Sequence, residues 1–223
     1  MAVHRVRAFT GFMAGVAFLA LSLQSSQAET RPTAVVIVGG SAAAGWHDAT
    51  GKGYIVRALD TLPKRLAVEN KAIPGSRVIN PQVRARFPRW MSNTRGGLLI
   101  IAWGYLNDLR LQTPQRSIVQ AIHWEIAEGL KTGHAVLLVS PPATAPTFTF
   151  DAKAEQVLWH KIFTMARHDF RRSPVSVFNV MSRMKDDIMA HGQTYQPYMK
   201  GAWDPNTRGH RLAARILTEE LMP

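Results

Sequence analysis

The sequence predicts an α/β protein in which a doubly wound, flavodoxin-like parallel sheet of about five strands lies between two layers of helices. Short unbroken apolar runs recur along the chain, as expected for strands buried on both faces. Stretches with helical periodicity separate these runs, so that strand and helix alternate. Glycines and polar residues follow three of the runs, at the sheet edge where such folds bind ligands.

The expected elements follow one another in a regular order. The strands are expected at residues 34–38, 66–68, 98–103, 135–139 and 175–178, with the weakest signal at 66–68. The helices between them are expected around residues 54–62, 117–130 and 154–165. A last amphipathic helix carries Leu212, Ile216 and Leu221 and begins after Asn206 or Thr207 as N-cap. The proline-rich residues 141–146 are expected to form a loop over the ligand-binding edge.

Residues 1–28 are predicted to be a secretory signal peptide. Arg5 and Arg7 precede an apolar stretch over residues 9–23, and Ser26 and Ala28 provide small residues for cleavage after Ala28. The apolar stretch is shorter than the roughly 20 residues that cross a bilayer, although a retained anchor is the alternative. The mature protein is therefore expected to be residues 29–223, a single periplasmic or secreted domain.

The charge and the composition restrict the classes of partner and cofactor that the protein is expected to bind. The formal net charge is +12, and removing Arg5 and Arg7 with the signal peptide leaves +10. This charge favours an anionic polymer or a membrane surface as partner, unless the basic residues are merely spread over solvated faces. Nucleic acid is not expected outside the cytoplasm. There are no cysteines, which excludes disulfides and thiolate chemistry, and the histidines show no metal-ligand spacing, so no cofactor or metal is expected.

Three loops after expected strands supply the groups that acyl transfer needs. Ser41 follows the first strand after two glycines, Gly75 follows the second strand after a proline, and Asn107 follows the third. A hydroxyl, a backbone N–H and a carboxamide at one sheet edge provide a nucleophile and an oxyanion hole. A dinucleotide-binding turn with Glu69 on the ribose is the alternative, but the glycine spacing does not fit it.

Aromatic residues accompany these loops. Trp46, Trp103 and Tyr105 are expected to line the pocket, with burial in the core as the alternative for each.

The blocks Val38-Gly39-Gly40-Ser41, Ile73-Pro74-Gly75 and Gly104-Tyr105-Leu106-Asn107-Asp108, followed by residues 205–210, resemble the SGNH (GDSL-type) hydrolase family. The resemblance implies that Ser41 is the nucleophile, and that the Ser41 N–H, the Gly75 N–H and the Asn107 side chain form the oxyanion hole. It also implies ester hydrolysis without a cofactor. Gly40 stands where the family usually has Asp.

The last block departs from the family pattern of Asp-x-x-His-Pro. Alignment on Pro205 and Asn206 puts Asp204 at the histidine position and Gly201 at the aspartate position, whereas an alternative alignment makes Asp204 the triad acid and puts Thr207 at the histidine position. A carboxylate is a weaker base than imidazole by roughly 2.5 pKa units in reference conditions. It also becomes neutral on taking the serine proton, whereas an imidazole becomes a cation that stabilises the oxyanion.

Two histidines remain as alternative bases. His210 lies about one and a half turns into the last helix, and His191 lies in a polar stretch that precedes the last block. The sequence leaves two functions open. One is an esterase with an atypical base, acting on a small ester or an acylated carbohydrate. The other is a catalytically inactive protein of the same fold that binds an anionic glycan or an acylated ligand.

Overall fold

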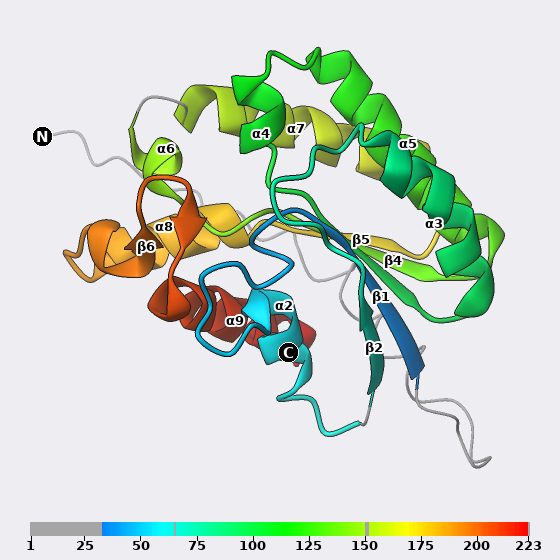
Figure 1. Ribbon diagram of the computed structural model, residues 1–223, viewed down its shortest axis with the longest axis horizontal. Helices are drawn as coiled ribbons and strands as arrows, with labels where there is room; N and C mark the ends of the chain where they lie inside the picture. The colour runs from blue at the N-terminus through cyan, green and yellow to red at the C-terminus, as the bar shows by residue number, and fades with distance from the viewer. Residues whose placement is uncertain (1–32, 65, 150–151, 223) are drawn as a thin grey trace, which may run out of the picture.

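The computed structural model describes residues 33–64, 66–149 and 152–222. Five parallel strands form one sheet in the order β2-β1-β3-β4-β5, which is the predicted flavodoxin-like arrangement (Figure 1). The strands are β1 (Thr33–Gly39), β2 (Leu66–Asn70), β3 (Leu98–Ala102), β4 (Ala135–Val139) and β5 (Val175–Phe178). The predicted fold class is therefore confirmed. The predicted signal peptide lies outside the described residues.

Helices cover both faces of the sheet (Figure 1). One layer contains α2 (Gly53–Leu59), α8 (Val180–Ala190) and α9 (Thr207–Leu221), with α9 packed against the other two. The opposite layer contains α3 (Pro81–Asn93), α5 (Gln115–Lys131) and α7 (Ala152–Asp169), with α5 packed between the other two. Two short helices, α4 (Leu106–Arg110) and α6 (Ala145–Phe148), lie near the carboxyl ends of the strands. No helix in the described part of the chain is both long and apolar enough to span a membrane.

The sheet forms the centre of the core. The side chains of Val35, Val36 and Ile37 in β1 are fully buried, and those of β3 and β4 are nearly as buried. At the sheet edge, β2 has exposed residues at Ala67 and Glu69, which explains its weak apolar signal. The strands that carry the strongest apolar runs are therefore those buried on both faces.

The sequence did not predict α3, α4, α6 or α8. In addition, the loop predicted at residues 141–146 ends earlier, because Ala145 and Pro146 form the first turn of α6. A proline fits the first turn of a helix, where its missing N–H would have no helical partner.

The last helix begins where the sequence predicted. The Asn206 side chain accepts hydrogen bonds from the N–H groups of Arg208 and Gly209, and so caps α9. Its Nδ2 also donates to the carbonyl oxygens of Pro197 and Met199, at 3.0 Å each. These bonds hold the short antiparallel pair β6 (Met199–Lys200) and β7 (Asp204–Pro205) against the start of α9.

Candidate active site

Ser41 lies in a tight turn directly after β1. Gly39 packs against β3 so closely that a Cβ at this position would lie 2.2 Å from the Ala102 carbonyl oxygen. The turn continues with hydrogen bonds from the Ala44 N–H to the Gly40 carbonyl and from the Trp46 N–H to the Ser41 carbonyl, both 3.0 Å. The chain therefore leaves the sheet abruptly and presents Ser41 at the carboxyl edge of the strands.

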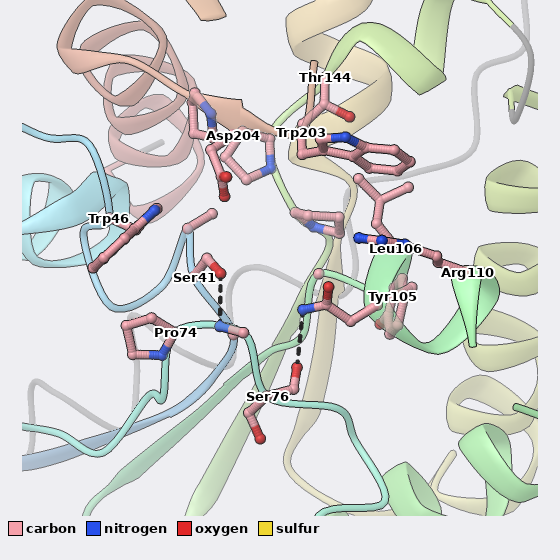
Figure 2. Close-up of a pocket in the computed structure, with 18 of the residues that line it drawn as sticks. Ser41, Trp46, Pro74, Ser76, Tyr105, Leu106, Arg110, Thr144, Trp203 and Asp204 are labelled. Atoms are coloured by element: carbon pink, nitrogen blue, oxygen red, sulfur yellow. Dashed lines mark hydrogen bonds between the residues drawn. The ribbon is translucent and has the colours of Figure 1, made fainter. Parts of the chain in front are cut away.

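Gly75 supplies a backbone N–H to the serine. Its nitrogen lies 2.9 Å from Ser41 Oγ, which accepts the hydrogen bond (Figure 2). Gly75 has a φ of 72°, a conformation that glycine adopts readily and other residues rarely do. The loop that carries it is held at both ends. The Ile73 N–H donates to the Gly39 carbonyl at 3.0 Å, and the Val78 N–H donates to Asp108 Oδ2 at 3.1 Å.

Asn107 lies in the first turn of α4 and lines the same pocket. Its Nδ2 is 3.5 Å from the Ser76 carbonyl oxygen, which is a long and weak hydrogen bond. The next residue, Asp108, is buried and anchors the Gly75 loop through Val78. The third block therefore supplies one amide to the pocket and one carboxylate that positions the second block.

Asp204 completes the polar part of the pocket. It comes from β7, and its carboxylate is directed towards the side of the pocket that holds Ser41 (Figure 2). Burial raises the pKa of the Asp204 carboxyl above its usual value, and the charge of His47 partly opposes this shift. The four residues that the sequence selected as catalytic, Ser41, Gly75, Asn107 and Asp204, therefore line one cavity of about 430 Å³.

The aromatic residues separate into two groups. Trp46 and Tyr105 line the cavity. Trp103 does not line it, because its side chain is buried and its Nε1 donates to Glu125 Oε2 at 2.9 Å. The sequence analysis missed Trp203, which also lines the cavity and lies next to Asp204 in the chain. The signal that could have found Trp203 is its place directly before Asp204, a residue that the block alignment had already assigned to the site.

The two alternative bases lie elsewhere. His210 is fully buried, and its Nε2 lies 2.9 Å from the Trp46 carbonyl oxygen. Burial lowers the pKa of His210, which favours the neutral ring as donor of that bond. His191 is exposed at the end of α8, where its Nδ1 contacts the Asp187 carbonyl oxygen at 2.8 Å. No histidine is among the described residues that line the cavity.

The last block and the serine turn are joined by two contacts. The first is the contact of His210 with Trp46, and the second is a 2.8 Å hydrogen bond from the Ala49 N–H to Thr207 Oγ1. Together they hold residues 46–49 against the first turns of α9, beside Asp204. His210 thus has a positioning role in the fold, whichever group acts as base.

In the described part of the chain, no three histidine or acidic side chains lie close enough together to hold a metal ion. The cavity instead offers hydrogen-bond donors and two carboxylates, those of the partly buried Asp204 and of the buried Glu155, which accepts a hydrogen bond from Thr147. Such a set is suited to stabilising negative charge on an oxygen and to moving a proton.

Comparisons with known proteins show which structures share this fold. No family model matches the sequence, and no curated protein matches it. Protein YxiM from Bacillus subtilis superposes with a TM-score of 0.68 at 17% identity, over 88% of this chain and 58% of that chain. This chain thus spans little more than half the length of YxiM.

Two shorter proteins are matched over nearly their whole length. A member of the lipolytic G-D-S-L family from Veillonella parvula has a TM-score of 0.66 at 14% identity, over 83% of this chain and 96% of that chain. The acetylxylan esterase Axe2 from Geobacillus stearothermophilus has a TM-score of 0.67 at 12% identity, over 87% of this chain and 97% of that chain. The chain therefore has the fold of the SGNH (GDSL-type) hydrolases, as its sequence blocks predicted.

Proposed function

We propose that the protein is an exported serine hydrolase that cleaves small esters, with O-acyl groups on carbohydrates as the substrate class. One observation carries the proposal. Ser41 Oγ, the Gly75 N–H, the Asn107 amide and the Asp204 carboxylate line a single cavity, although they come from four separate segments of the chain. This combination contains a nucleophile, a base and two oxyanion donors.

The reaction follows from these positions. Ser41 Oγ attacks the ester carbonyl carbon while its proton passes to Asp204, and the carbonyl π electrons move onto the oxygen. The Gly75 N–H, which contacts Ser41 Oγ at rest, and the weakly bonded Asn107 amide then stabilise this oxyanion. When the intermediate collapses, the alcohol leaves with the proton from Asp204. Water repeats the sequence on the acyl-enzyme and releases the acid.

Asp204 is the proposed base because its carboxylate lies on the Ser41 side of the cavity. Burial raises its pKa and brings its proton affinity closer to that of imidazole. In the esterase Axe2, a serine-to-alanine and a histidine-to-alanine variant are both described as catalytic mutants. A carboxylate in place of histidine lacks the cationic partner of the oxyanion, so turnover slower than that of a histidine enzyme is expected.

The carbohydrate assignment rests on two tryptophans. Trp46 and Trp203 are 50% and 41% exposed, and both line the cavity on either side of Asp204 (Figure 2). An exposed indole at a pocket offers an apolar face and a polar N–H, which suits the alternating apolar and polar surface of a sugar ring. The acetylxylan esterase fold neighbour agrees with this substrate class.

Labelling with an active-site fluorophosphonate tests the proposed chemistry. Covalent labelling of the wild type is expected, and it should disappear in Ser41→Ala but persist in Ser76→Ala, a matched control because Ser76 also lines the cavity. Acetate release from acetylated xylooligosaccharides should follow the same pattern.

The absence of a histidine from the described lining residues favours a second function, ligand binding without turnover. That function predicts no labelling of the wild type, together with esterase activity appearing in the double variant Asp204→His, Gly201→Asp. Gly201 has a φ of 69°, a conformation that aspartate tolerates better than most residues, so the double variant is expected to fold.

Export is tested separately. Expression of the full chain in a Gram-negative host, followed by fractionation and N-terminal sequencing, should find the protein in the periplasm beginning at Glu29. Retention in the membrane fraction with an uncleaved N-terminus would contradict this part of the proposal.

A further inference from the structure

A second cavity shares one loop with the candidate active site. It has a volume of about 300 Å³ and lies between α3 and α5, where it is lined by Val78, Ile79, Arg84, Ser117, Gln120, Ala121, Trp124 and Glu125. The loop after β2 forms a wall of both cavities, because residues 74–76 line the first and residues 78–79 the second. Ser76 and Val78 are two residues apart, so the two rims lie within about 7 Å of each other along the chain.

The second cavity contains donors that the fold does not use. The Arg84 guanidinium stacks on the Trp124 ring, with its Cζ 4.4 Å from the ring centroid, and forms no ion pair with any described residue. The side chains of Ser117 and Gln120 likewise have no hydrogen-bond partner among the residues that the structure describes. Stacking holds the guanidinium plane in place and leaves its N–H groups available.

The stretch of chain that includes one wall of this cavity is rich in basic residues. The sequence from Asn70 to Asn107 contains six basic residues and no acidic residue, namely Lys71, Arg77, Arg84, Arg86, Arg89 and Arg95. Glu125 is the acidic residue among those that line the second cavity, and it is buried with a pKa of about 8, so it is largely uncharged at neutral pH. On the rim of the first cavity, Arg110 adds an exposed cation.

We infer that the two cavities form one binding track for an acidic polysaccharide, in which the first cavity holds the acylated sugar and the second holds a neighbouring uronate residue through Arg84. A guanidinium binds a carboxylate with two parallel hydrogen bonds, and Gln120 and Ser117 are placed to bond sugar hydroxyls. The net charge of the chain favours the approach of such a polyanion. This inference rests on the proposed function, because it names the substrate class of the same site.

Binding is measured apart from turnover. Isothermal titration calorimetry of the Ser41→Ala protein with an oligogalacturonate is expected to show tighter binding than with a neutral xylooligosaccharide of equal length. Arg84→Gln in the same background should weaken oligogalacturonate binding about tenfold or more, the value of a charge-assisted hydrogen bond, and should leave the neutral ligand nearly unaffected. Arg84→Lys should give an intermediate loss, because it keeps the charge and loses the two-point geometry.

Arg95→Gln is the matched control. Arg95 is exposed and basic and belongs to the same acid-free stretch, but it precedes β3 and so lies at the edge of the sheet opposite the cavities. The Ser41→Ala protein that also carries Arg95→Gln should bind both ligands with the same affinity as Ser41→Ala alone. Equal losses of oligogalacturonate affinity in Arg84→Gln and Arg95→Gln would show a diffuse charge effect and would contradict the inferred binding track. Equal affinity for the acidic and neutral ligands would also overturn it, as would binding to phosphatidylglycerol vesicles without binding to oligogalacturonate.

The same proteins separate this inference from the proposed function. If the protein with Ser41 intact hydrolyses none of the acylated sugars while Ser41→Ala binds oligogalacturonate in an Arg84-dependent way, the track stands and the hydrolase proposal fails. If the esters are hydrolysed but the acidic ligand has no preference, the hydrolase proposal stands and the track fails.

Discussion

Glu125 is predicted to make the stability of the protein depend on pH across the neutral range. Its side chain is buried, and burial raises its pKa from 4.5 to about 8 although the hydrogen bond from Trp103 opposes the shift. The folded state therefore retains a proton that the unfolded chain loses. The stability from this proton is fully present below pH 4.5 and is lost as the pH rises through 8.

Glu125→Gln removes this titration and keeps an oxygen that accepts the Trp103 N–H. One group can change the free energy of unfolding by at most about 1.4 kcal/mol per pH unit. Between pH 5.5 and 7.5, wild type should therefore lose about 2 to 3 kcal/mol relative to Glu125→Gln. For a domain of this size, that loss corresponds to a relative fall in Tm of roughly 5 to 10 °C.

Urea denaturation followed by circular dichroism at several pH values measures the difference directly. Glu128→Gln is the control, because it removes a carboxylate from the same helix that pairs with Lys131 at the surface. Parallel pH profiles for wild type and Glu125→Gln would refute the reasoning. Glu125 would then be ionised in the folded state at neutral pH, and the second cavity would be a poorer site for an anion.

Three further predictions concern the site. Asp204→Asn should lower kcat by roughly 10²- to 10⁴-fold, because the proposed base is lost. It should also raise Tm at neutral pH, because burial raises the pKa of Asp204 and makes its ionised form unfavourable in the folded protein. Unchanged ester hydrolysis by this variant would exclude Asp204 as base. In Gly75→Ala, the new Cβ meets no atom within 4 Å, but the alanine must adopt a φ of 72°. The free energy of unfolding, measured by urea denaturation, should therefore fall by roughly 1 to 2 kcal/mol. Gly75→Ala should also lower kcat by shifting the oxyanion donor, whereas Gly133→Ala, with a φ of 79° at the opposite sheet edge, should show the stability loss alone. Gly39→Ala should express poorly and bind no ligand in calorimetry, because its Cβ would lie 2.2 Å from the rigid Ala102 carbonyl oxygen. A well-folded, active Gly39→Ala protein would show that β1 and β3 approach less closely.

The sheet could be predicted because its inner strands carry continuous apolar runs. The alternation of strand and helix also indicates that each strand is joined to the next through a helix, as in a parallel sheet. The helices that escaped prediction show where this signal fails. In α3, only Val83, Phe87 and Met91 are buried, and a proline and several arginines interrupt the pattern. In α8, the buried residues Val180, Met181, Met184 and Ile188 do follow helical spacing after an Asn179 cap, so a periodicity search over this segment would have found it.

The site was predictable to the extent that parallel strands bring their following loops to one edge. Ser41, Gly75 and Asn107 lie after the ends of β1, β2 and β3, respectively, and none is more than about five residues from its strand. Asp204 comes instead from a two-residue strand whose place depends on the Asn206 bonds, and only the block alignment pointed to it. The burial of Trp103 and the exposure of Trp203 depend on long-range packing with α5 and β7, which local sequence does not reveal.

The two contacts between the serine turn and the start of α9 have a consequence for biogenesis. A ribosome releases the serine turn long before Thr207 and His210, which follow their partners Ala49 and Trp46 by 158 and 164 residues. The turn at residues 46–49 therefore lacks its partners until the start of α9 has been synthesised. A product that ends before Thr207 would retain every strand of the central sheet, but it would lack both contacts to the serine turn and the buried face of α9.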